Sequence, residues 1–278
     1  MIYCRFHGRT GNQMFQYAAA RALALHHGVE IALDDRLAIR RGERSITRVF
    51  NLARVNNPTL PPLQKDQELR YRIWRYFGRN PRFHREEKLS YNNNFFDISD
   101  NSYLHGYWQS EKYFQHISDT IRADFSFPEP TGKNLELAHQ ISETNSVSVH
   151  LRRGDYLALQ AHAVCDQSYY DAALNELLRD FRAEPQIFVF SDDPQWAREN
   201  LVLPGDPVVV DHNGEDQDFE DMRLMSLCKH NVIANSSFSW WGAWLNRNPS
   251  RRVIAPKQWF GLNSMSNPDI WAEGWTKV

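Results

Sequence analysis

The most constraining feature of this sequence is a regular alternation of apolar and helical segments in its second half. Short apolar runs predict strands at residues 146–151, 186–191, 207–210, 231–234 and 252–255. Helical segments separate them, at residues 168–182, 194–200, 218–229 and 238–246. Apolar strands that alternate with helices predict a parallel sheet covered on both faces. The alternation therefore assigns this half of the chain to the α/β class.

The chain also opens with a strand–loop–helix–strand unit. Residues 2–6 predict a strand, residues 13–27 a helix that stops at Gly28, and residues 30–33 a second strand. This unit has the order expected of a Rossmann-like domain, so the first half of the chain also belongs to the α/β class.

The middle of the chain is less regular. Three prolines at residues 56–64 predict a loop, and the composition shifts again around residues 127–133, where we place a domain boundary. We therefore expect an α/β fold of two Rossmann-like domains facing a cleft, at residues 1–133 and 134–278.

Composition excludes several classes of protein. The chain of 278 residues is 42% hydrophobic and 24% charged, which is typical of a globular protein. Its net charge of −2 argues against a protein built to wrap nucleic acid, and no apolar run approaches the roughly 18 residues of a membrane span. The three cysteines, Cys4, Cys165 and Cys228, do not form a disulfide framework. Without a recognisable signal peptide, these features predict a cytoplasmic protein.

Ligands of open parallel sheets bind at the carboxyl ends of strands, so the loops after the strands hold the candidate residues. Residues 150–156 (HLRRGDY) leave the strand at 146–151. The guanidinium groups of Arg152 and Arg153 predict a phosphate clamp, because arginine offers paired donors to phosphate oxygens. The alternative is a surface loop whose arginines and aspartate pair with each other.

A run of small hydroxyl residues follows the strand at 231–234. Ser236 and Ser237 stand where the next helix begins, and free N–H groups at a helix start favour phosphate. Helix capping alone is the alternative. We expect Trp240, Trp241 and Trp244 to pack in the core, because aromatic residues at helical spacing usually do so.

The first strand is followed by a glycine-containing turn, residues 8–13, which presents Asn12 and Gln13 at the start of the first helix. The turn does not have the GxGxxG spacing of a dinucleotide site. A tight turn with a helix cap is the alternative interpretation.

Acidic pairs that resemble metal ligands have another explanation. Asp216 and Asp218 form a DxD triplet, but they lie at a predicted helix start, where the helix dipole favours acidic residues. We therefore predict helix capping there, and no metal site in the chain.

Four sequence blocks together resemble one protein family. HLRRGDY at 150–156 resembles the HxRRGDY motif of the α-1,2-fucosyltransferases, glycosyltransferase family eleven. GNQMFQYA at 11–18 and GYWQSEKYF at 106–114 resemble two further blocks of that family. The C-terminal block corresponds to DMRLM at 221–225 and NSSFSWW at 235–241. One departure is Arg9-Thr10, where many members have Gly-Leu.

The resemblance implies a two-domain GT-B fold, GDP-L-fucose as the donor, inversion at the anomeric carbon and no obligatory metal or other cofactor. The acceptor would be a terminal β-galactoside, fucosylated at its 2-hydroxyl to give an α-1,2 linkage in a cell-surface glycan such as an O-antigen.

The resemblance also implies roles for individual residues. Arg152 would bind the donor β-phosphate, His150 would lie beside the nucleotide, and Asp221 would accept hydrogen bonds from the guanine edge. The full set of expected donor-binding residues is His150, Arg152, Arg153, Asp192, Asp221, Ser236 and Ser237, with Asp193 beside Asp192 as a further nucleotide candidate.

Three catalytic candidates follow. Arg152 and the helix start after Ser236 would stabilise the charge that develops on GDP. Asp155 is the nearest carboxylate of the motif and is either a base or a group that orients Arg152 or Arg153. Asn12 is the third candidate. The acceptor-side candidates are Asn12, Gln13, Tyr107 and Trp108, in the first domain.

The segment 70–85 is basic and aromatic. It is either a solvated helix face or a contact with an anionic membrane surface, where lipid-linked glycans reside. The rival functions are transfer from another sugar nucleotide, glycan binding without catalysis on the same fold, and RNA binding through this segment. The sequence does not predict an oligomeric state.

Overall fold

The chain folds into two compact units. The computed structural model describes residues 1–78, 80–154, 165–182, 184–262 and 265–278. The N-terminal unit comprises residues 1–126 together with residues 268–270, and the C-terminal unit comprises residues 127–267 and 271–278. The division at 126/127 precedes the boundary expected from the sequence at 133/134, so residues 127–133 belong to the C-terminal unit.

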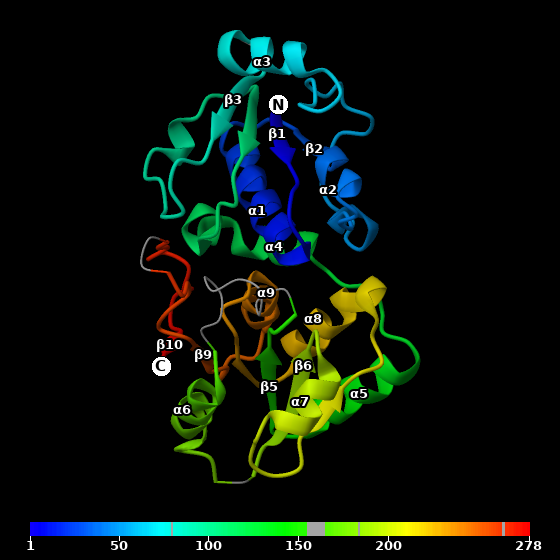
Figure 1. Cartoon of the computed structure of the whole chain (residues 1–278), viewed down its shortest axis with the longest axis vertical. Helices are drawn as coiled ribbons and strands as arrows, with labels where there is room; N and C mark the ends of the chain where they lie inside the picture. The colour runs from blue at the N-terminus through cyan, green and yellow to red at the C-terminus, as the bar shows by residue number, and fades with distance from the viewer. Residues whose placement is uncertain (79, 155–164, 183, 263–264) are drawn as a thin grey trace. The chain divides into compact units, whose positions relative to one another are not determined.

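A four-stranded parallel sheet forms the centre of the N-terminal unit (Figure 1). Its order is β2-β1-β4-β3, and every neighbouring pair is parallel. The strands are β1 (Ile2–Arg5), β2 (Ile31–Asp34), β3 (Arg82–Arg85) and β4 (Ser102–His105). The next strand in the chain, β2, pairs with one edge of β1, and β4 pairs with the other edge. The strand order therefore reverses between β1 and β4.

Helix α1 (Thr10–His26) packs on β1 and is buried along most of its length. Its alanines and large apolar side chains explain this, because a helix that is apolar on most sides is stable only when it is covered. The other helices of the unit are α2 (Arg36–Arg40), α3 (Glu68–Phe77) and α4 (Ser118–Asp124), with short 3₁₀ helices at Ile46–Arg48, Phe95–Asp97, Glu111–Tyr113 and Gln115–Ile117.

The C-terminal unit contains a six-stranded parallel sheet of order β10-β9-β8-β5-β6-β7. The strands are β5 (Ser146–Leu151), β6 (Gln186–Ser191), β7 (Val208–Val210), β8 (His230–Val232), β9 (Val253–Ala255) and β10 (Thr276–Lys277). In chain order this is the 3-2-1-4-5-6 arrangement of a doubly wound sheet, which reverses direction between β5 and β8.

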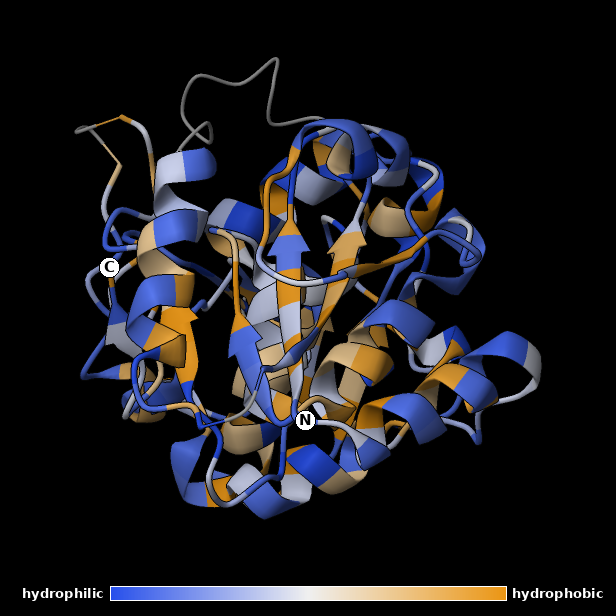
Figure 2. Cartoon of the chain, turned by 90° about the horizontal axis from the view of Figure 1, so that it is seen from below, coloured by the Kyte–Doolittle hydropathy of each residue, from blue (hydrophilic) through white to orange (hydrophobic). Residues whose placement is uncertain are grey.

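Helices cover both faces of this sheet, as the alternation in the sequence predicts. They are α5 (Gly132–Glu143), α6 (Gln167–Leu178), α7 (Pro194–Asn200), α8 (Asp218–Leu227) and α9 (Ser237–Leu245), with a short 3₁₀ helix at Glu215–Gln217 before α8. Val147 and Val149 pack against α6 on one face, whereas Phe188 and Phe190 pack against α5 and α8 on the other. The apolar residues, orange in Figure 2, follow the strands and the helices beside them.

The predicted α/β class with parallel sheets is therefore confirmed. The strands at 146–151 and 186–191 and the helix at 194–200 have the bounds expected from the sequence. The sequence did not anticipate α2, α4, α5, β3, β4 or β10, and it indicated α3 only as one interpretation of the segment 70–85. Among the described residues, no helix combines the length and the apolar character needed to cross a membrane.

Candidate functional site

Three loops of the C-terminal unit meet at the carboxyl edge of its sheet. Residues 152–154 follow β5, Asp192 follows β6 and residues 233–236 follow β8. Since β5 pairs with both β6 and β8, the three loops are neighbours. The loops after β5 and β8 also flank the point where the sheet reverses, which is where open α/β sheets bind their ligands.

Both motif arginines are held by acids that follow β6. The guanidinium NH1 of Arg152 lies 3.2 Å from Oδ2 of Asp192, and the Arg152 side chain is only 12% exposed. Nε of Arg153 lies 3.4 Å from Oδ2 of Asp193. The arginines therefore pair with the two aspartates expected beside the nucleotide. The alternative interpretation, pairing within the loop itself, involves Asp155 and lies outside the described residues.

Arg153 has further fixed contacts. Its backbone N–H donates to Oδ1 of Asp192 at 2.9 Å, and its guanidinium lies 3.7 Å from the centroid of the Trp196 ring. A Cβ on Gly154 would approach Asp192 Oδ2 to 2.7 Å, so the glycine leaves room for that carboxylate. Asp155, the candidate base or orienting group, lies outside the described residues.

His150 is a buried neutral imidazole. Burial and the neighbouring Arg152 guanidinium lower the pKa of His150 to about 3. Its ring lies 5.7 Å from the Phe238 ring, and its Nδ1 has no hydrogen-bond partner among the described residues. A buried polar atom without a partner is unusual in proteins. This nitrogen is therefore available to a ligand that reaches it.

The start of α9 lies beside this histidine. Ser236 is the N-cap residue, and its hydroxyl accepts from the N–H of Phe238 at 3.3 Å. The neighbouring Asn235 is buried and donates to the Trp259 carbonyl at 3.0 Å. Ser236 therefore caps the helix, as the alternative interpretation expected. The cap coexists with a helix start at the point where the sheet reverses. Ser237 is the first residue of α9.

The three tryptophans of α9 lie in the core, as expected. Trp240 and Trp241 are fully buried, and Trp244 is nearly so. Their rings contact one another, with centroid separations of 5.0 to 6.1 Å. They hold the helix whose first turn carries the serines.

Asp221 lies in the first turn of α8, beyond the end of β7. Its Oδ1 accepts from the Asn213 amide at 2.7 Å, and Asn213 is in turn bonded to Asn134. Burial raises the pKa of Asp221 to about 7, with a further contribution from the Asp218 carboxylate, and the Asn213 hydrogen bond opposes the shift. A half-buried acid with a pKa shifted toward neutrality is typical of functional sites.

The DxD triplet surrounds the start of the same helix. Asp216 lies in the 3₁₀ helix before α8, and Asp218 is the first residue of α8, in agreement with an interaction with the helix dipole. Within the described ranges, no three His, Cys, Asp or Glu side chains are grouped so as to hold a metal ion.

In the N-terminal unit, two of the motif blocks meet where its sheet reverses. Asn12 lies in the first turn of α1, just after the loop that follows β1, and the loop after β4 carries Gln109. The Gln109 amide donates to Asn12 Oδ1 at 2.8 Å. Gly8, with φ of +79°, allows this, since a Cβ there would lie 2.6 Å from Asn12 Nδ2.

The other acceptor-side candidates differ in accessibility. Gln13 is fully buried, and its amide bonds to the backbone of Gly8, Arg44 and Ile46. Trp108 is also buried, at 3% exposure, whereas Tyr107 is 37% exposed and lies against the His7 ring at 4.6 Å. Tyr107 and Asn12 thus have side-chain surface to offer, and Gln13 and Trp108 support the loops.

Glu86 is a functional candidate that the sequence did not reveal. It follows the edge strand β3, and its two carboxylate oxygens accept from the backbone N–H groups of Tyr107 at 2.7 Å and Trp108 at 3.0 Å. Burial raises the pKa of Glu86 to about 7, although both hydrogen bonds oppose the shift. The adjacent acids Glu86 and Glu87 after a short basic stretch were the only signal in the sequence.

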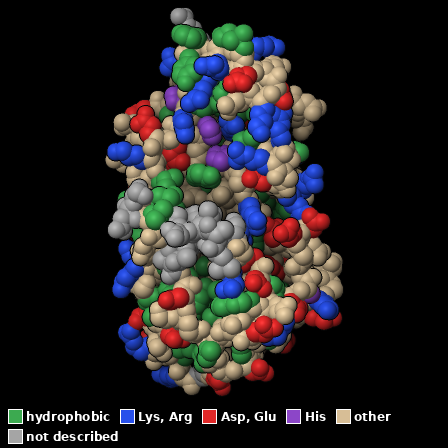
Figure 3. All heavy atoms as spheres, viewed as in Figure 1, with side chains coloured by type: hydrophobic (Ala, Val, Ile, Leu, Met, Phe, Trp, Pro, Cys, Tyr) green, Lys and Arg blue, Asp and Glu red, His purple; other side chains and the backbone are tan. Residues whose placement is uncertain are grey.

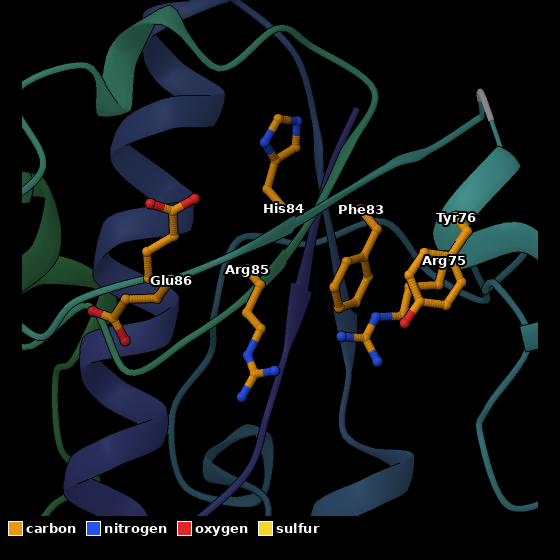
Figure 4. A pocket seen from close by; sticks show the side chains of 7 residues that line it. Arg75, Tyr76, Phe83, His84, Arg85 and Glu86 are labelled. Carbon is orange, nitrogen blue, oxygen red and sulfur yellow. The ribbon is translucent and has the colours of Figure 1, made fainter. Parts of the chain in front are cut away.

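An open pocket of about 640 Å³ lies against β3 (Figure 4). Its lining residues are Arg75, Tyr76, Phe83, His84, Arg85, Glu86 and Glu87. Basic and histidine side chains gather on this face of the N-terminal unit, in blue and purple in Figure 3. Burial and the charge of Arg5 lower the pKa values of His7 to about 4 and His105 to about 3, so both rings are neutral at pH 7.

A doubly wound sheet with an arginine and a helix start at its reversal point defines a class of protein: α/β proteins that bind phosphorylated ligands at the sheet edge. Comparison with known sequences identifies the family. The chain belongs to Glycosyl transferase family 11, whose family model matches residues 1–278. It is therefore a glycosyltransferase, and the resemblance described from the four blocks is confirmed.

Curated relatives match most or all of the chain. It is 33% identical over 298 residues to an alpha-1,2-colitosyltransferase of Escherichia coli, covering 100% of this chain and 99% of that protein. It is 31% identical to the O-antigen biosynthesis glycosyltransferase WbnK of Escherichia coli, covering 95% and 97%. A galactoside alpha-(1,2)-fucosyltransferase 1 of Ateles belzebuth is 28% identical, with coverage of 86% of this chain and 63% of the relative.

Among solved structures, the chain resembles the NodZ alpha-1,6-fucosyltransferase soaked with GDP-fucose. The TM-score is 0.50 at 14% identity, and the match covers 88% of this chain and 91% of NodZ. At this identity the likeness concerns the fold alone, and it agrees with the expected GT-B class.

Proposed function

We propose that the protein transfers L-fucose from GDP-β-L-fucose to the 2-hydroxyl of a terminal β-galactoside, with inversion, to form an α-1,2 linkage. The observation that carries the proposal is the position of Arg152. It follows the central strand β5, at the reversal point of the sheet, within the HLRRGDY sequence of the family. The family and the α-1,2 specificity in the names of two relatives support it.

The donor would bind across the carboxyl edge of the C-terminal sheet. Arg152 would contact the β-phosphate, which would share or replace Asp192 as its partner. Ser236 and Ser237, at the start of α9, would hold phosphate oxygens and complete the anion site. Asp221, when ionised, would accept from the N–H groups of the guanine edge. Arg153, fixed by Asp193 and Trp196, would support Arg152.

The transfer step needs negative charge to be stabilised on the departing GDP. Arg152 and the α9 start would supply this as preorganised donors, a role that typically contributes a large share of catalysis. The fucose would pass through an oxocarbenium-like state while the acceptor hydroxyl attacks from the opposite face. Asp155 remains the candidate for accepting the hydroxyl proton, or for orienting the arginines.

The acceptor would bind in the N-terminal unit. Asn12 and Tyr107 have accessible side-chain surface near the point where the sheet reverses between β1 and β4. Gln13 and Trp108 would act as positioning residues, because the structure buries both. We further propose that the acceptor is a lipid-linked glycan and that the enzyme acts in the cytoplasm, at the inner face of the membrane. All three cysteines are free thiols, which suits that compartment.

A second donor is favoured by one observation. The relative at 33% identity is named for colitosyl transfer, and colitose differs from fucose by the loss of the 3-hydroxyl. A site that hydrogen-bonds the 3-hydroxyl would reject the deoxy sugar strongly. The two GDP sugars therefore have to be compared directly.

The deciding experiment measures GDP release from GDP-L-fucose and from GDP-colitose, with lactose or N-acetyllactosamine as acceptor and EDTA present. We expect turnover with GDP-fucose, and an α-1,2 linkage in the product by NMR. Preference for GDP-colitose would assign the second donor. Loss of activity with EDTA that Mg²⁺ restores would contradict the proposed independence of metal. GDP-fucose binding without transfer to any galactoside would favour the non-catalytic alternative.

Arg152→Ala tests the phosphate role in the same assay. We expect a loss of about 10²- to 10³-fold in kcat, the usual effect of removing one preorganised charge-stabilising donor. Arg198→Ala is the matched control, because Arg198 is an exposed arginine of the same unit that also pairs with an aspartate, Asp211. Near-normal turnover and unchanged donor affinity in Arg152→Ala would refute the phosphate clamp.

A further inference from the structure

Helix α3 exposes a continuous apolar stripe. Leu69 is 73% exposed, Ile73 53%, Tyr76 67% and Phe77 80%. Their spacing of i, i+4, i+7 and i+8 places all four on one side of the helix. At about 100° per residue they span an arc of about 100°. Large apolar side chains exposed in a row are uncommon on a soluble surface and indicate an interaction site.

The opposite side of α3 is anchored in the N-terminal unit. Tyr71 and Trp74 are buried and pack with Tyr103 and Phe83. The Trp74 indole also donates to the Pro81 carbonyl at 3.0 Å. The helix is thus held by one side, and its exposed stripe points away from the core.

Basic side chains border the stripe on both sides. On the helical wheel Arg72 precedes the arc and Arg70 follows it, and both are exposed. Residues 69–85 contain six arginines and no acidic residue, in a chain whose net charge is −2. This segment is therefore strongly basic although the chain as a whole is slightly acidic.

The pocket beside α3 adds two arginines to this surface, and its lining also includes Glu86 and Glu87. Figure 4 shows Arg75 and Tyr76 on α3 facing Phe83 and Arg85 of β3. The Arg75 guanidinium lies 5.3 Å from the centroids of both the Tyr76 and the Phe83 rings. An anionic headgroup that enters the pocket would meet two guanidinium groups, those of Arg75 and Arg85.

We propose that α3 docks the protein on an anionic lipid bilayer. The stripe of Leu69, Ile73, Tyr76 and Phe77 enters the interface between headgroups and acyl chains, and Arg70 and Arg72 contact lipid phosphates. Such a helix lies in the plane of the membrane surface, with its apolar side inward and basic residues beside it. This proposal does not depend on the identity of the donor or the acceptor.

Two alternatives were left open by the sequence. A solvated helix face would not require four large apolar side chains in one exposed row. RNA binding would use the arginines but not the stripe, because phosphate pairing gains nothing from exposed leucine and isoleucine. The combination of apolar stripe and charge favours lipid over both.

Vesicle flotation of the full-length protein tests the proposal. The vesicles are phosphatidylcholine, with or without phosphatidylglycerol, at increasing salt. We expect binding only with phosphatidylglycerol. Arg70→Gln with Arg72→Gln should weaken partitioning about thirtyfold, since each arginine near an anionic surface contributes about fivefold. Leu69→Ser with Phe77→Ser should weaken it about tenfold or more through lost apolar burial.

Matched controls come from the C-terminal unit. Val202→Ser removes an apolar side chain with the same exposure as Leu69, and Arg247→Gln with Arg251→Gln removes two exposed arginines. These variants should bind vesicles like the unchanged protein. Turnover of a soluble acceptor should be normal in the α3 variants, which separates docking from catalysis.

Insertion of the apolar stripe into the bilayer can be measured separately. Phe77→Trp should show additional fluorescence quenching by brominated lipid, beyond that of the unchanged protein. The proposal is overturned if the protein does not bind anionic vesicles, if the α3 variants bind as well as the controls, or if no additional quenching occurs. Binding to RNA but not to vesicles would also overturn it.

Discussion

At the scale of single residues, the two units each contain a half-buried acid with a raised pKa. Asp221 of the C-terminal unit and Glu86 of the N-terminal unit both titrate at about 7. Burial is the main cause in each case, because it penalises the charged form. Burying an acid in this way opposes stability, so each acid needs another reason to be there.

The proposed role of Asp221 predicts a pH dependence of GDP affinity. Only the ionised carboxylate can accept both guanine N–H groups, so affinity should fall as the pH drops through 7. Affinity at pH 6 should be about tenfold weaker than at pH 8, from the fraction ionised. Isothermal titration calorimetry with GDP measures this. Asp221→Asn should bind weakly with a flat profile, whereas Glu215→Gln, which removes an exposed acid nearby, should keep it.

Asp221 also predicts that protein stability changes with pH in the opposite direction to GDP affinity. The folded-state pKa of Asp221 lies above its unfolded value, so the folded chain holds the extra proton between about pH 4 and 7. Its contribution to stability is therefore present below about pH 4 and is lost as the pH rises through 7. Asp221→Asn without ligand should melt at a higher temperature than the unchanged protein at pH 8. A lower Tm there would contradict this account of the buried charge.

At the scale of elements, loops are positioned by neighbouring strands rather than by their own sequences. The loop after β5 is held by acids after β6, and the loop after β4 is held by Glu86 after β3. Trp108 has a φ of +54°, a left-handed conformation that is uncommon for a bulky residue. The Glu86 carboxylate, which accepts the Trp108 N–H, fixes this turn.

The substitution Glu86→Gln tests whether the acid after β3 holds the loop after β4. The amide has a single acceptor oxygen, so one of the two N–H groups would face an NH₂ group. We expect a loss of about 1–3 kcal/mol in the free energy of unfolding. As a positioning residue, Glu86 should affect the acceptor KM more than kcat and leave GDP affinity unchanged. Glu87→Gln is the control, because Glu87 is adjacent and exposed. An unchanged acceptor KM would mean that Glu86 has no role in acceptor binding.

At the scale of the whole molecule, the chain returns to its first unit near its C-terminal end. Residues 268–270 belong to the N-terminal unit. Asp269 accepts from the Tyr91 N–H at 2.8 Å and from Lys112 Nζ at 2.6 Å. The N-terminal unit is therefore completed by a segment that is distant in sequence.

Asp269→Ala should lower the thermal stability of the protein. It leaves the Tyr91 N–H without its acceptor, at a cost of about 1–3 kcal/mol in the free energy of unfolding. Lys112→Met is the comparison, because it removes only the ion pair between Lys112 and Asp269, in which the lysine is exposed. This loss should lower the free energy of unfolding by less than about 1 kcal/mol. Denaturant unfolding of both variants gives the two values. Equal effects would mean that the ion pair, not the backbone hydrogen bond, holds the segment.

The elements foreseen from sequence share one property. The strands at 146–151 and 186–191 are continuous apolar runs, and such runs have to be buried between helices whatever their partners are. The edge strand β3, with sequence RFHR, has no such run. It is a strand because it pairs with β4, which local sequence does not encode. Helix α3 was seen only as a basic and aromatic segment.

The same distinction applies to the candidate site. By itself, the sequence determined the α/β class, the family and the strand-end loops that carry Arg152 and Ser236, because apolar periodicity and short motifs are local patterns. Only the tertiary structure decided which acids hold the arginines, that Gln13 and Trp108 are buried, and that one side of α3 is exposed. Asp192 is 39 residues beyond Arg153 in the chain, yet it accepts the Arg153 N–H. Pairing and burial of this kind depend on which strands become neighbours, and that is settled when the whole sheet packs.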